Sequence, residues 1–299
     1  MKSISMLNLC FLLLIGISCS SSDNNDTGTV PPGMSQNPKP DEKPDPETIV
    51  LGDWKLEWED NFDTNLNQWD IWEGGAFNNE IQLYRSEQLS LADGILSIKA
   101  NRMAISGPTN PFDTTVKDFS YVSGRIETKV TYGPENTNGK REYRIISRIK
   151  LPKGFGMWPA FWTFADPWPT KGEIDILEAR GNQPHTLASN IFYGSQAGNS
   201  QLKQSDTKKE YTVTPDTRAD FHEYELIWKK EGLQILFDGE LLGTYEASEK
   251  NGLVQFFGSK HKIILNLAVG GLFFPPNSDP KDFPDTAVME VDWVKVYKR

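Results

Sequence analysis

Three carboxylates lie close together in the apolar stretch 173–178. In a β-strand, successive side chains alternate between the two faces, so Glu173 and Asp175 share a face and Glu178 falls on the other. One extra residue near Ile176 and Leu177, a β-bulge, would return Glu178 to the face of the other two. A helix would scatter the three around its circumference. The spacing therefore predicts a bulged strand with three acids on one face.

Carboxyls that crowd on one face repel one another, so their pKa values move apart. One then stays ionised while another stays protonated near neutral pH. Glycoside hydrolysis uses such a pair, a carboxylate nucleophile and a carboxylic acid that protonates the leaving oxygen. An acidic edge strand and a metal site are the alternative explanations of the same three acids.

The start of the chain is typical of a secretory leader. Lys2 precedes an apolar run from Leu7 to Ile17 that is too short to span a membrane. Cys19 follows small residues and resembles the cleavage site of a bacterial lipoprotein, so we expect residues 1–18 to be a signal peptide and Cys19 to carry lipid. Residues 20–26 resemble the acidic surface-export signal of Bacteroidetes lipoproteins. Together these features imply a lipid anchor in the outer membrane, exposed at the cell surface, with a periplasmic or a secreted protein as the alternative.

Composition predicts the domain organisation. Residues 19–49 are rich in Pro, Ser and Asp and are expected to form a disordered tether, followed by one folded domain over 50–299. Cys10 and Cys19 are the two cysteines of the 299-residue chain, and both lie in the leader. The mature domain therefore has no disulfide, no thiolate metal site and no cysteine nucleophile.

Charge and motifs exclude several classes of protein. Asp and Glu outnumber Lys and Arg by 41 to 31, a formal net charge of −10 that argues against a nucleic-acid partner. The three histidines have no metal-ligand spacing, and neither a Gly-x-Ser-x-Gly elbow nor a phosphate-binding loop is present. Nine tryptophans offer flat rings that can stack on sugars.

Short apolar-alternating runs, divided by Gly, Pro and Asn turns, dominate the region after residue 50. The clearest runs are 94–100, 121–129, 223–228, 233–238, 262–267 and 288–297. Many short strands at this spacing predict an all-β fold of the β-sandwich type. Asp238-Gly239 between two runs predicts a tight hairpin turn.

The stretch 168–180 resembles the bulged active-site motif of glycoside hydrolase family 16, with the laminarinase-like branch as the nearest match. Segments 72–84, 155–164, 189–194 and 265–271 resemble the family in the expected order. The resemblance implies a jelly roll of two curved antiparallel sheets with a concave cleft for an extended polysaccharide. It also implies retention of configuration, with Glu173 as the nucleophile, Asp175 as its hydrogen-bonding neighbour and Glu178 as the acid/base.

The resemblance also implies substrate contacts. These are expected at Asn78, Asn79, Trp158, Trp162, Trp168, Asn190 and Asn266. The alternatives are an Asn/Gly loop without ligand for the first two, core packing for one of Trp158 and Trp162, and a backbone carbonyl as the partner of Asn266. Phe192 stands where the family often has His, which leaves the substrate subtype open.

Many family members carry a structural calcium ion away from the cleft. The matching positions are the Asp292 side chain and the Gly94 carbonyl, with a further ligand near Glu59 or Asp60. Oxygen ligands from distant strands suit Ca²⁺. Catalysis itself requires no cofactor.

These observations predict a monomeric, lipid-anchored, retaining endo-β-glucanase. Its expected substrates are β-1,3-glucan such as laminarin, mixed-linkage β-1,3/1,4-glucan, or both. One alternative is a hydrolase of algal galactan (agar, porphyran or carrageenan), in which Arg180 or Lys171 would bind sulfate. Another is a non-catalytic surface glycan-binding lipoprotein, and transglycosylation through the same covalent intermediate is a third.

Overall fold

The computed structural model describes residues 52–134, 141–201, 207–229, 232–247 and 252–299. The chain divides into two units, 1–48 and 49–299, and the described residues all belong to the second. The predicted signal peptide, lipidation site Cys19 and tether lie outside the described residues. Among the residues that are described, no helix is long and apolar enough to cross a membrane.

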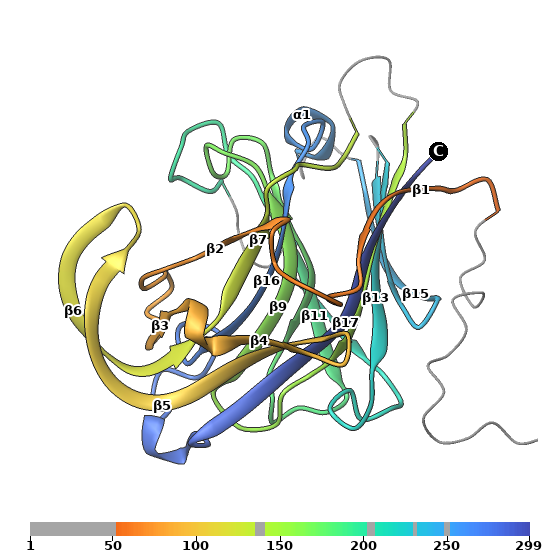
Figure 1. Cartoon of the computed structure of the whole chain (residues 1–299). Coiled ribbons are helices and arrows are strands. Elements are labelled where there is room, and N and C mark those ends of the chain that lie inside the picture. The colour runs from red at the N-terminus through yellow and green to blue at the C-terminus, as the bar shows by residue number, and fades with distance from the viewer. Residues whose placement is uncertain (1–51, 135–140, 202–206, 230–231, 248–251) are drawn as a thin grey trace, which may run out of the picture. The chain divides into compact units, whose positions relative to one another are not determined.

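Two β-sheets form the second unit (Figure 1). Sheet A contains, in spatial order, β15 (Glu240–Glu246), β14 (Gly232–Phe237), β13 (His222–Lys229), β8 (Tyr143–Lys150), β17 (Thr286–Lys298), β5 (Ile95–Asn110), β6 (Asp113–Ser123) and β3 (Gln82–Tyr84), with β1 (Lys55–Asp60) on β17 and β4 (Leu89–Ala92) on β5. Sheet B contains β12 (Lys209–Thr212), β11 (Thr186–Phe192), β10 (Glu173–Ala179), β9 (Met157–Phe164), β16 (Lys262–Val269), β7 (Arg125–Thr128) and β2 (Trp69–Ile71). Strands pair antiparallel except β3 with β6.

Helical structure in the described residues is limited to short turns. These are α1 (Leu253–Phe256) and the 3₁₀ turns η2 (Ser86–Gln88) and η4 (Pro280–Asp282). The predicted all-β sandwich is therefore confirmed. The predicted hairpin is also present, because Asp238 and Gly239 join β14 to β15. Both residues have positive φ (48° and 79°), as the type I′ turn of a two-residue hairpin requires.

The hydrophobic core lies between the sheets because alternate side chains of each strand point inward. Ile174 and Ile191 of sheet B and Ile145, Leu226 and Trp228 of sheet A are all buried in it. Since every second residue of a strand points the other way, the intervening residues of β10, β9 and β16 lie on the outer face of sheet B. That outer face carries the polar residues singled out above.

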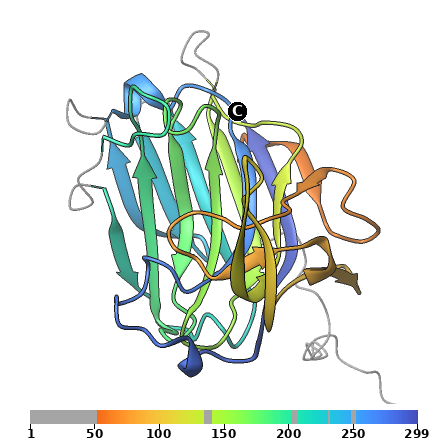
Figure 2. The same ribbon diagram turned by 90° about the vertical axis from the view of Figure 1, so that its left-hand side faces the viewer.

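The hairpin of β5 and β6 extends beyond the sandwich. Figure 1 shows it as a yellow arm that curves away from sheet A, and Figure 2 shows it standing in front of the outer face of sheet B. We call residues 103–119 the arm.

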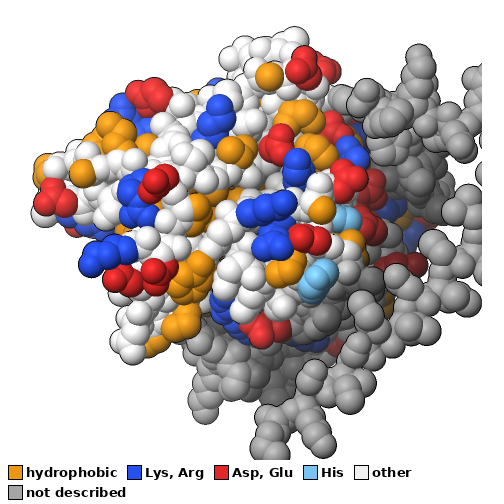
Figure 3. Space-filling view, turned by 90° about the horizontal axis from the view of Figure 1, so that it is seen from below, with side chains coloured by type: hydrophobic (Ala, Val, Ile, Leu, Met, Phe, Trp, Pro, Cys, Tyr) orange, Lys and Arg blue, Asp and Glu red, His pale blue; other side chains and the backbone are white. Residues whose placement is uncertain are grey.

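Surface charge is mixed. On the described part of the face seen from below, Lys and Arg side chains stand among Asp and Glu (Figure 3). Over the described surface as a whole, opposite charges pair, as in Lys150–Glu290 (3.0 Å) and Arg218–Asp216 (2.8 Å). This face does not offer the continuous basic surface that a polyphosphate would need.

Candidate active site

Strand β10 contains the predicted bulge. Its pairing with β9 jumps from Asp175 to Leu177, and its pairing with β11 jumps from Asp175 to Glu178. Asp175 lies opposite Trp162 and Glu178 opposite Ala160. Because Trp162 and Ala160 are two residues apart on one strand, they share a face, and so do the acids opposite them. The bulge therefore places Glu178 beside Asp175, as the spacing predicted.

Each glutamate accepts a hydrogen bond from an indole. Trp168, in the loop between β9 and β10, donates from Nε1 to Glu173 Oε2 at 2.6 Å. Trp158 on β9 donates from Nε1 to Glu178 Oε1 at 2.9 Å. Asp175 lies between the two glutamates in sequence and is 5% exposed. Two of the three tryptophans predicted to contact substrate thus donate hydrogen bonds to the catalytic glutamates.

Burial perturbs all three acids. It raises the pKa of Glu173 to about 8 and the pKa of Glu178 to about 7, and it raises the pKa of Asp175 well above its ordinary range. Repulsion adds to burial, because the charge of Glu178 raises the pKa of Glu173 and both glutamates raise the pKa of Asp175. The trio therefore retains protons near neutral pH, which a general acid requires.

A fourth carboxylate, Glu80, belongs to the same site. It is 8% exposed and accepts hydrogen bonds from Gln82 Nε2 (2.6 Å) and the Tyr84 hydroxyl (3.4 Å). Its charge raises the pKa of Glu178, and burial raises the pKa of Glu80 itself. In the sequence, Glu80 was predicted only as part of the family-like segment 72–84, with no role of its own. An acid directly after Asn78-Asn79 was the available signal.

Asn266 of β16 links Glu80 to the aromatic residues. Trp162 Nε1 donates to Asn266 Oδ1 at 2.7 Å, and Asn266 Nδ2 donates to the Tyr84 hydroxyl at 3.1 Å. Tyr84 in turn donates to Glu80. Within the protein, the partners of Asn266 are side chains and not the backbone carbonyl considered as the alternative, while the expected contact with a sugar hydroxyl stays a prediction. The network orients the Trp162 ring on the outer face.

Comparison with known proteins identifies the family. The model of the glycosyl hydrolases family 16 matches residues 87–295. This chain belongs to glycosyl hydrolase family 16. It is 35% identical over 266 residues to a glucan endo-1,3-beta-glucosidase of Cryptopygus antarcticus, covering 82% of this chain and 92% of the relative. It is 31% identical to a beta-glucanase of Rhodothermus marinus, covering 82% and 85%.

Solved structures agree with the observed fold. The X-ray structure of an endo-beta-1,3-glucanase from Pyrococcus furiosus superimposes with a TM-score of 0.68 at 32% identity, covering 82% of this chain and 94% of that one. The two-sheet sandwich described above is thus the jelly roll of family 16. The chain is a glycoside hydrolase with endo-1,3-β-glucanase relatives.

At one end of this family 16 site, Arg125 connects two tryptophans. Its guanidinium pairs with Glu127 at 2.6 Å and lies over the rings of Trp72 (4.0 Å) and Trp162 (4.9 Å). The charge of Arg125 also lowers the pKa of Glu173, against the effect of burial. The ion pair with Glu127 thus holds the Arg125 guanidinium beside the two tryptophan rings.

At the other end, Glu178 faces a second aromatic and basic group. Trp158 stacks on Phe273 with ring centres 4.6 Å apart. The guanidinium of Arg180 lies over Phe273 at 4.0 Å, and both Arg180 (3.2 Å) and Lys208 (3.1 Å) pair with Glu210. The charges of Lys208 and Arg180 oppose the rise in the pKa of Glu178.

The predicted asparagine contacts lie around the same face. Asn78 and Asn79 are exposed and have positive φ (59° and 58°), a conformation that Asn tolerates better than most residues. Asn190 lies opposite Asp175, is 4% exposed, and accepts from the Ile191 backbone N–H at 2.9 Å. Phe192 lies opposite Glu173. The structure thus places Trp158, Trp162, Asn190 and Asn266 on strands of sheet B, and Trp168 in the loop before β10.

The one side-chain ligand named for the predicted calcium site, Asp292, has a cationic partner in the protein itself. The Asp292 carboxylate is 3% exposed and pairs with Arg148 at 2.5 Å, so a guanidinium already occupies the place of a cation. Asp60 accepts from the Phe62 backbone N–H and the Trp69 indole. No group of three His, Cys, Asp or Glu in the described residues could hold a metal ion. We therefore derive no role for calcium.

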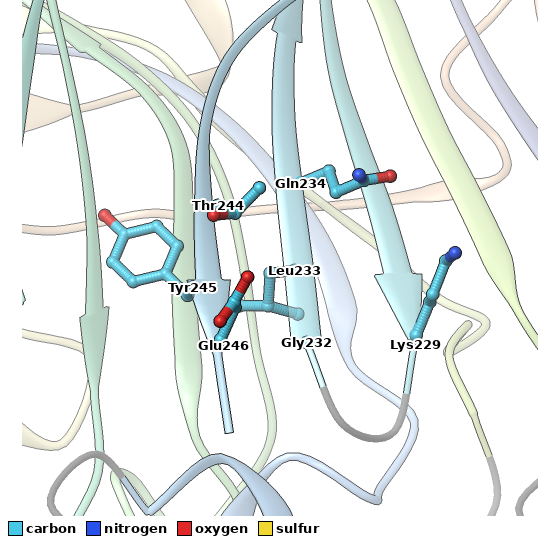
Figure 4. Close-up of a pocket in the computed structure, with 7 residues that line it drawn as sticks. All are labelled: Lys229, Gly232, Leu233, Gln234, Thr244, Tyr245 and Glu246. Atoms are coloured by element: carbon cyan, nitrogen blue, oxygen red, sulfur yellow. The ribbon is translucent and has the colours of Figure 1, made fainter. Parts of the chain in front are cut away.

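A shallow pocket lies elsewhere, at the β13–β15 edge of sheet A (Figure 4). Lys229, Gln234, Thr244 and Glu246 are among its lining residues. It shares no residue with the acid-bearing face of sheet B, and it brings together no second pair of carboxyls. We assign the chemistry to β10.

Proposed function

We propose that this protein is a retaining endo-β-glucanase acting on β-1,3-glucan such as laminarin, on mixed-linkage β-1,3/1,4-glucan, or on both. The observation that carries the proposal is the bulged strand β10, which presents Glu173, Asp175 and Glu178 on one face with raised pKa values. The printed names of the relatives, a glucan endo-1,3-beta-glucosidase and a beta-glucanase, support glucan as the substrate.

The proposed mechanism uses two displacements. The three acids titrate as a coupled group, and the reactive protonation state is the one in which Asp175 and Glu178 hold protons and Glu173 is ionised, a form that the Trp168 N–H and the charge of Arg125 favour. From this state Glu173 attacks the anomeric carbon while Glu178 transfers its proton to the leaving glycosidic oxygen. A covalent glycosyl-enzyme forms and the leaving sugar departs. Glu178, now ionised and held by the Trp158 N–H, removes a proton from water, which attacks the same carbon and releases Glu173. Asp175 keeps one proton in the trio available throughout.

The galactan alternative has less support. A sulfate-binding site needs a guanidinium or ammonium group free to contact the anion. Arg180, one of the two predicted candidates, donates from Nε to the Phe273 carbonyl and pairs with Glu210. The other, Lys171, is exposed in the loop before β10 and is a single ammonium group. A purely glycan-binding protein is also disfavoured, because buried, mutually repelling carboxyls cost stability that binding alone does not require.

The test is release of reducing ends from laminarin, barley mixed-linkage glucan, agarose and porphyran. Wild type is compared with Glu173→Gln and with the control Glu290→Gln on sheet A, far from β10 in the topology. Release on a glucan that is lost only in Glu173→Gln supports the proposal, and NMR of the first product should show the retained anomer. Release only on a galactan, or on no polymer while binding persists, would contradict it.

We further propose that Cys19 carries a lipid that anchors the domain in the outer membrane, facing the outside. The support is the leader pattern in the sequence. The measurement is labelling of the full chain with a palmitate analogue, followed by surface proteolysis of whole cells. A Cys19→Ala chain that is labelled and membrane-bound like wild type would contradict the anchor.

A further inference from the structure

Exposed apolar side chains gather on the arm. Phe112, at the tip between β5 and β6, is 82% exposed, Val116 is 68% exposed and Met103 is 51% exposed. A large aromatic ring at the tip of a hairpin contributes nothing to the core between the sheets. The arm that carries this ring stands in front of the outer face of sheet B (Figure 2), which calls for a different explanation.

The arm is held in place near its tip. The Gly75 backbone N–H donates to the Pro108 carbonyl at 3.0 Å. A Cβ on Gly75 would lie 2.3 Å from the Thr109 carbonyl oxygen, so the loop before β3 contacts the arm without any intervening side chain. The Phe112 N–H donates to Asn110 Oδ1 at 2.9 Å, which orders the turn itself. Phe112 is therefore presented from a supported turn.

A continuous series of contacts leads from the acids to Phe112. Trp162 lies opposite Asp175, and Arg125 lies over Trp162 at 4.9 Å. Arg125 also lies over Trp72 at 4.0 Å, and Trp72 meets Phe112 edge-to-face with ring centres 6.0 Å apart. Flat rings that follow one another along a surface suit the repeating pyranose faces of a glucan.

We propose that Phe112 is the outermost glucan contact of the cleft, stacking on a glucosyl ring that lies beyond Trp72. The occupant is the β-glucan chain itself, because Phe112 continues the surface that starts at the acids. This inference rests on the proposed function and extends it: the arm would give the enzyme a preference for long chains. A short oligosaccharide that fills only the places near β10 does not reach the tip.

The test compares kcat/KM for long-chain laminarin with kcat/KM for a short laminarioligosaccharide, in wild type, Phe112→Ala and Phe112→Trp. The control is Val116→Ala on the same arm, since that side chain makes no ring contact in the series. We expect the long-to-short ratio to fall about 3- to 10-fold in Phe112→Ala, the size of one lost aromatic contact, and to be restored in Phe112→Trp. Melting temperatures are measured for all variants.

An unchanged ratio in Phe112→Ala would overturn the inference while leaving the proposed function intact. An equal fall in Val116→Ala would also overturn it, because the effect would then belong to the arm as a whole. A wild-type enzyme that releases no sugar from any glucan would overturn the proposed function and this inference together. The fall confined to Phe112→Ala is the one supporting result.

Discussion

Carboxylates are buried on both sheets, but in two different settings. On sheet A, Glu225 is 1% exposed and contacts Arg144 through both oxygens, at 2.6 and 2.8 Å, and Asp292 contacts Arg148 at 2.5 Å. On β10 of sheet B, Asp175 and Glu178 are buried and Glu173 is partly buried beside them. Their direct partners are neutral indole N–H groups for the glutamates.

The two settings give the carboxylates different roles, a structural one on sheet A and a chemical one on β10. A carboxylate held by a bidentate guanidinium stays charged and joins neighbouring strands, here β8 and β13. A carboxylate buried among other carboxylates is destabilised in its charged form, so it exchanges a proton near neutral pH. Burial raises the pKa of Glu225 too, but the charge of Arg144 opposes the rise. The unpaired setting is the one suited to proton transfer.

The largest expected effect is on activity. Glu178→Gln should lower kcat/KM on glucan by about 10²- to 10⁴-fold, because the leaving oxygen receives no proton. Glu225→Gln should keep near wild-type turnover at temperatures where it is folded. Reducing-end assays on laminarin measure both. Similar losses in the two variants would erase the distinction between the settings.

Thermal stability should be lowered more by Glu225→Gln than by Glu178→Gln, the reverse of their effects on activity. Glu225→Gln removes the carboxylate that contacts the buried Arg144 guanidinium through both oxygens, so we expect a loss of about 3–5 kcal/mol of unfolding free energy. For a domain of this size that corresponds to roughly 6–20 °C in Tm. Thermal unfolding at pH 7 is the measurement. A loss below about 1 kcal/mol would mean that the ion pair is dispensable.

The dependence of stability on pH sharpens the same contrast. The pKa of Glu178 is raised from 4.5 to about 7 by folding, so the folded state binds more protons between these values and stability falls as pH rises through that window. Glu178→Gln removes this loss. The unfolding free energy of the variant minus that of wild type should therefore increase between about pH 4.5 and pH 8, by at most about 3 kcal/mol. Tm values measured across this range follow the change. A difference that is constant across this range would contradict the raised pKa.

A smaller effect is expected from Glu80. Its charge raises the pKa of Glu178, so Glu80→Gln should lower that pKa and move the basic limb of the kcat/KM profile to lower pH, by less than about one unit. Glu290→Gln, on the other sheet, is the matched control. A shift to higher pH, or the same shift in the control, would remove Glu80 from the electrostatics of the site.

The smallest effect concerns metal. Since Arg148 already pairs with Asp292, treatment of the purified domain with a chelator should change Tm by less than about 1 °C, and added Ca²⁺ should not raise it. Differential scanning calorimetry decides this. A drop of several degrees that calcium reverses would restore the metal site expected from the family.

Much of the site could be predicted from local pattern. Glu178 lies an odd number of positions after Glu173 and Asp175, so only a bulge can bring all three to one face of a strand. The bulge lies between Asp175 and Glu178. The Asp238-Gly239 turn followed from backbone preference alone. Such features depend on neighbours in sequence and are therefore readable in it.

The sequence by itself determined the fold class, the family and the three acids, because alternation and spacing act over a few residues. Only the tertiary structure decided the partners. Glu80, just before β3, acts on the pKa of Glu178. Asn266 hydrogen-bonds to Trp162 and Tyr84, and Asp292 pairs with Arg148. The arm comes to stand in front of the outer face of sheet B for the same reason. These contacts join residues tens to more than a hundred positions apart, and they depend on how the two sheets curve and pack, which no local pattern encodes.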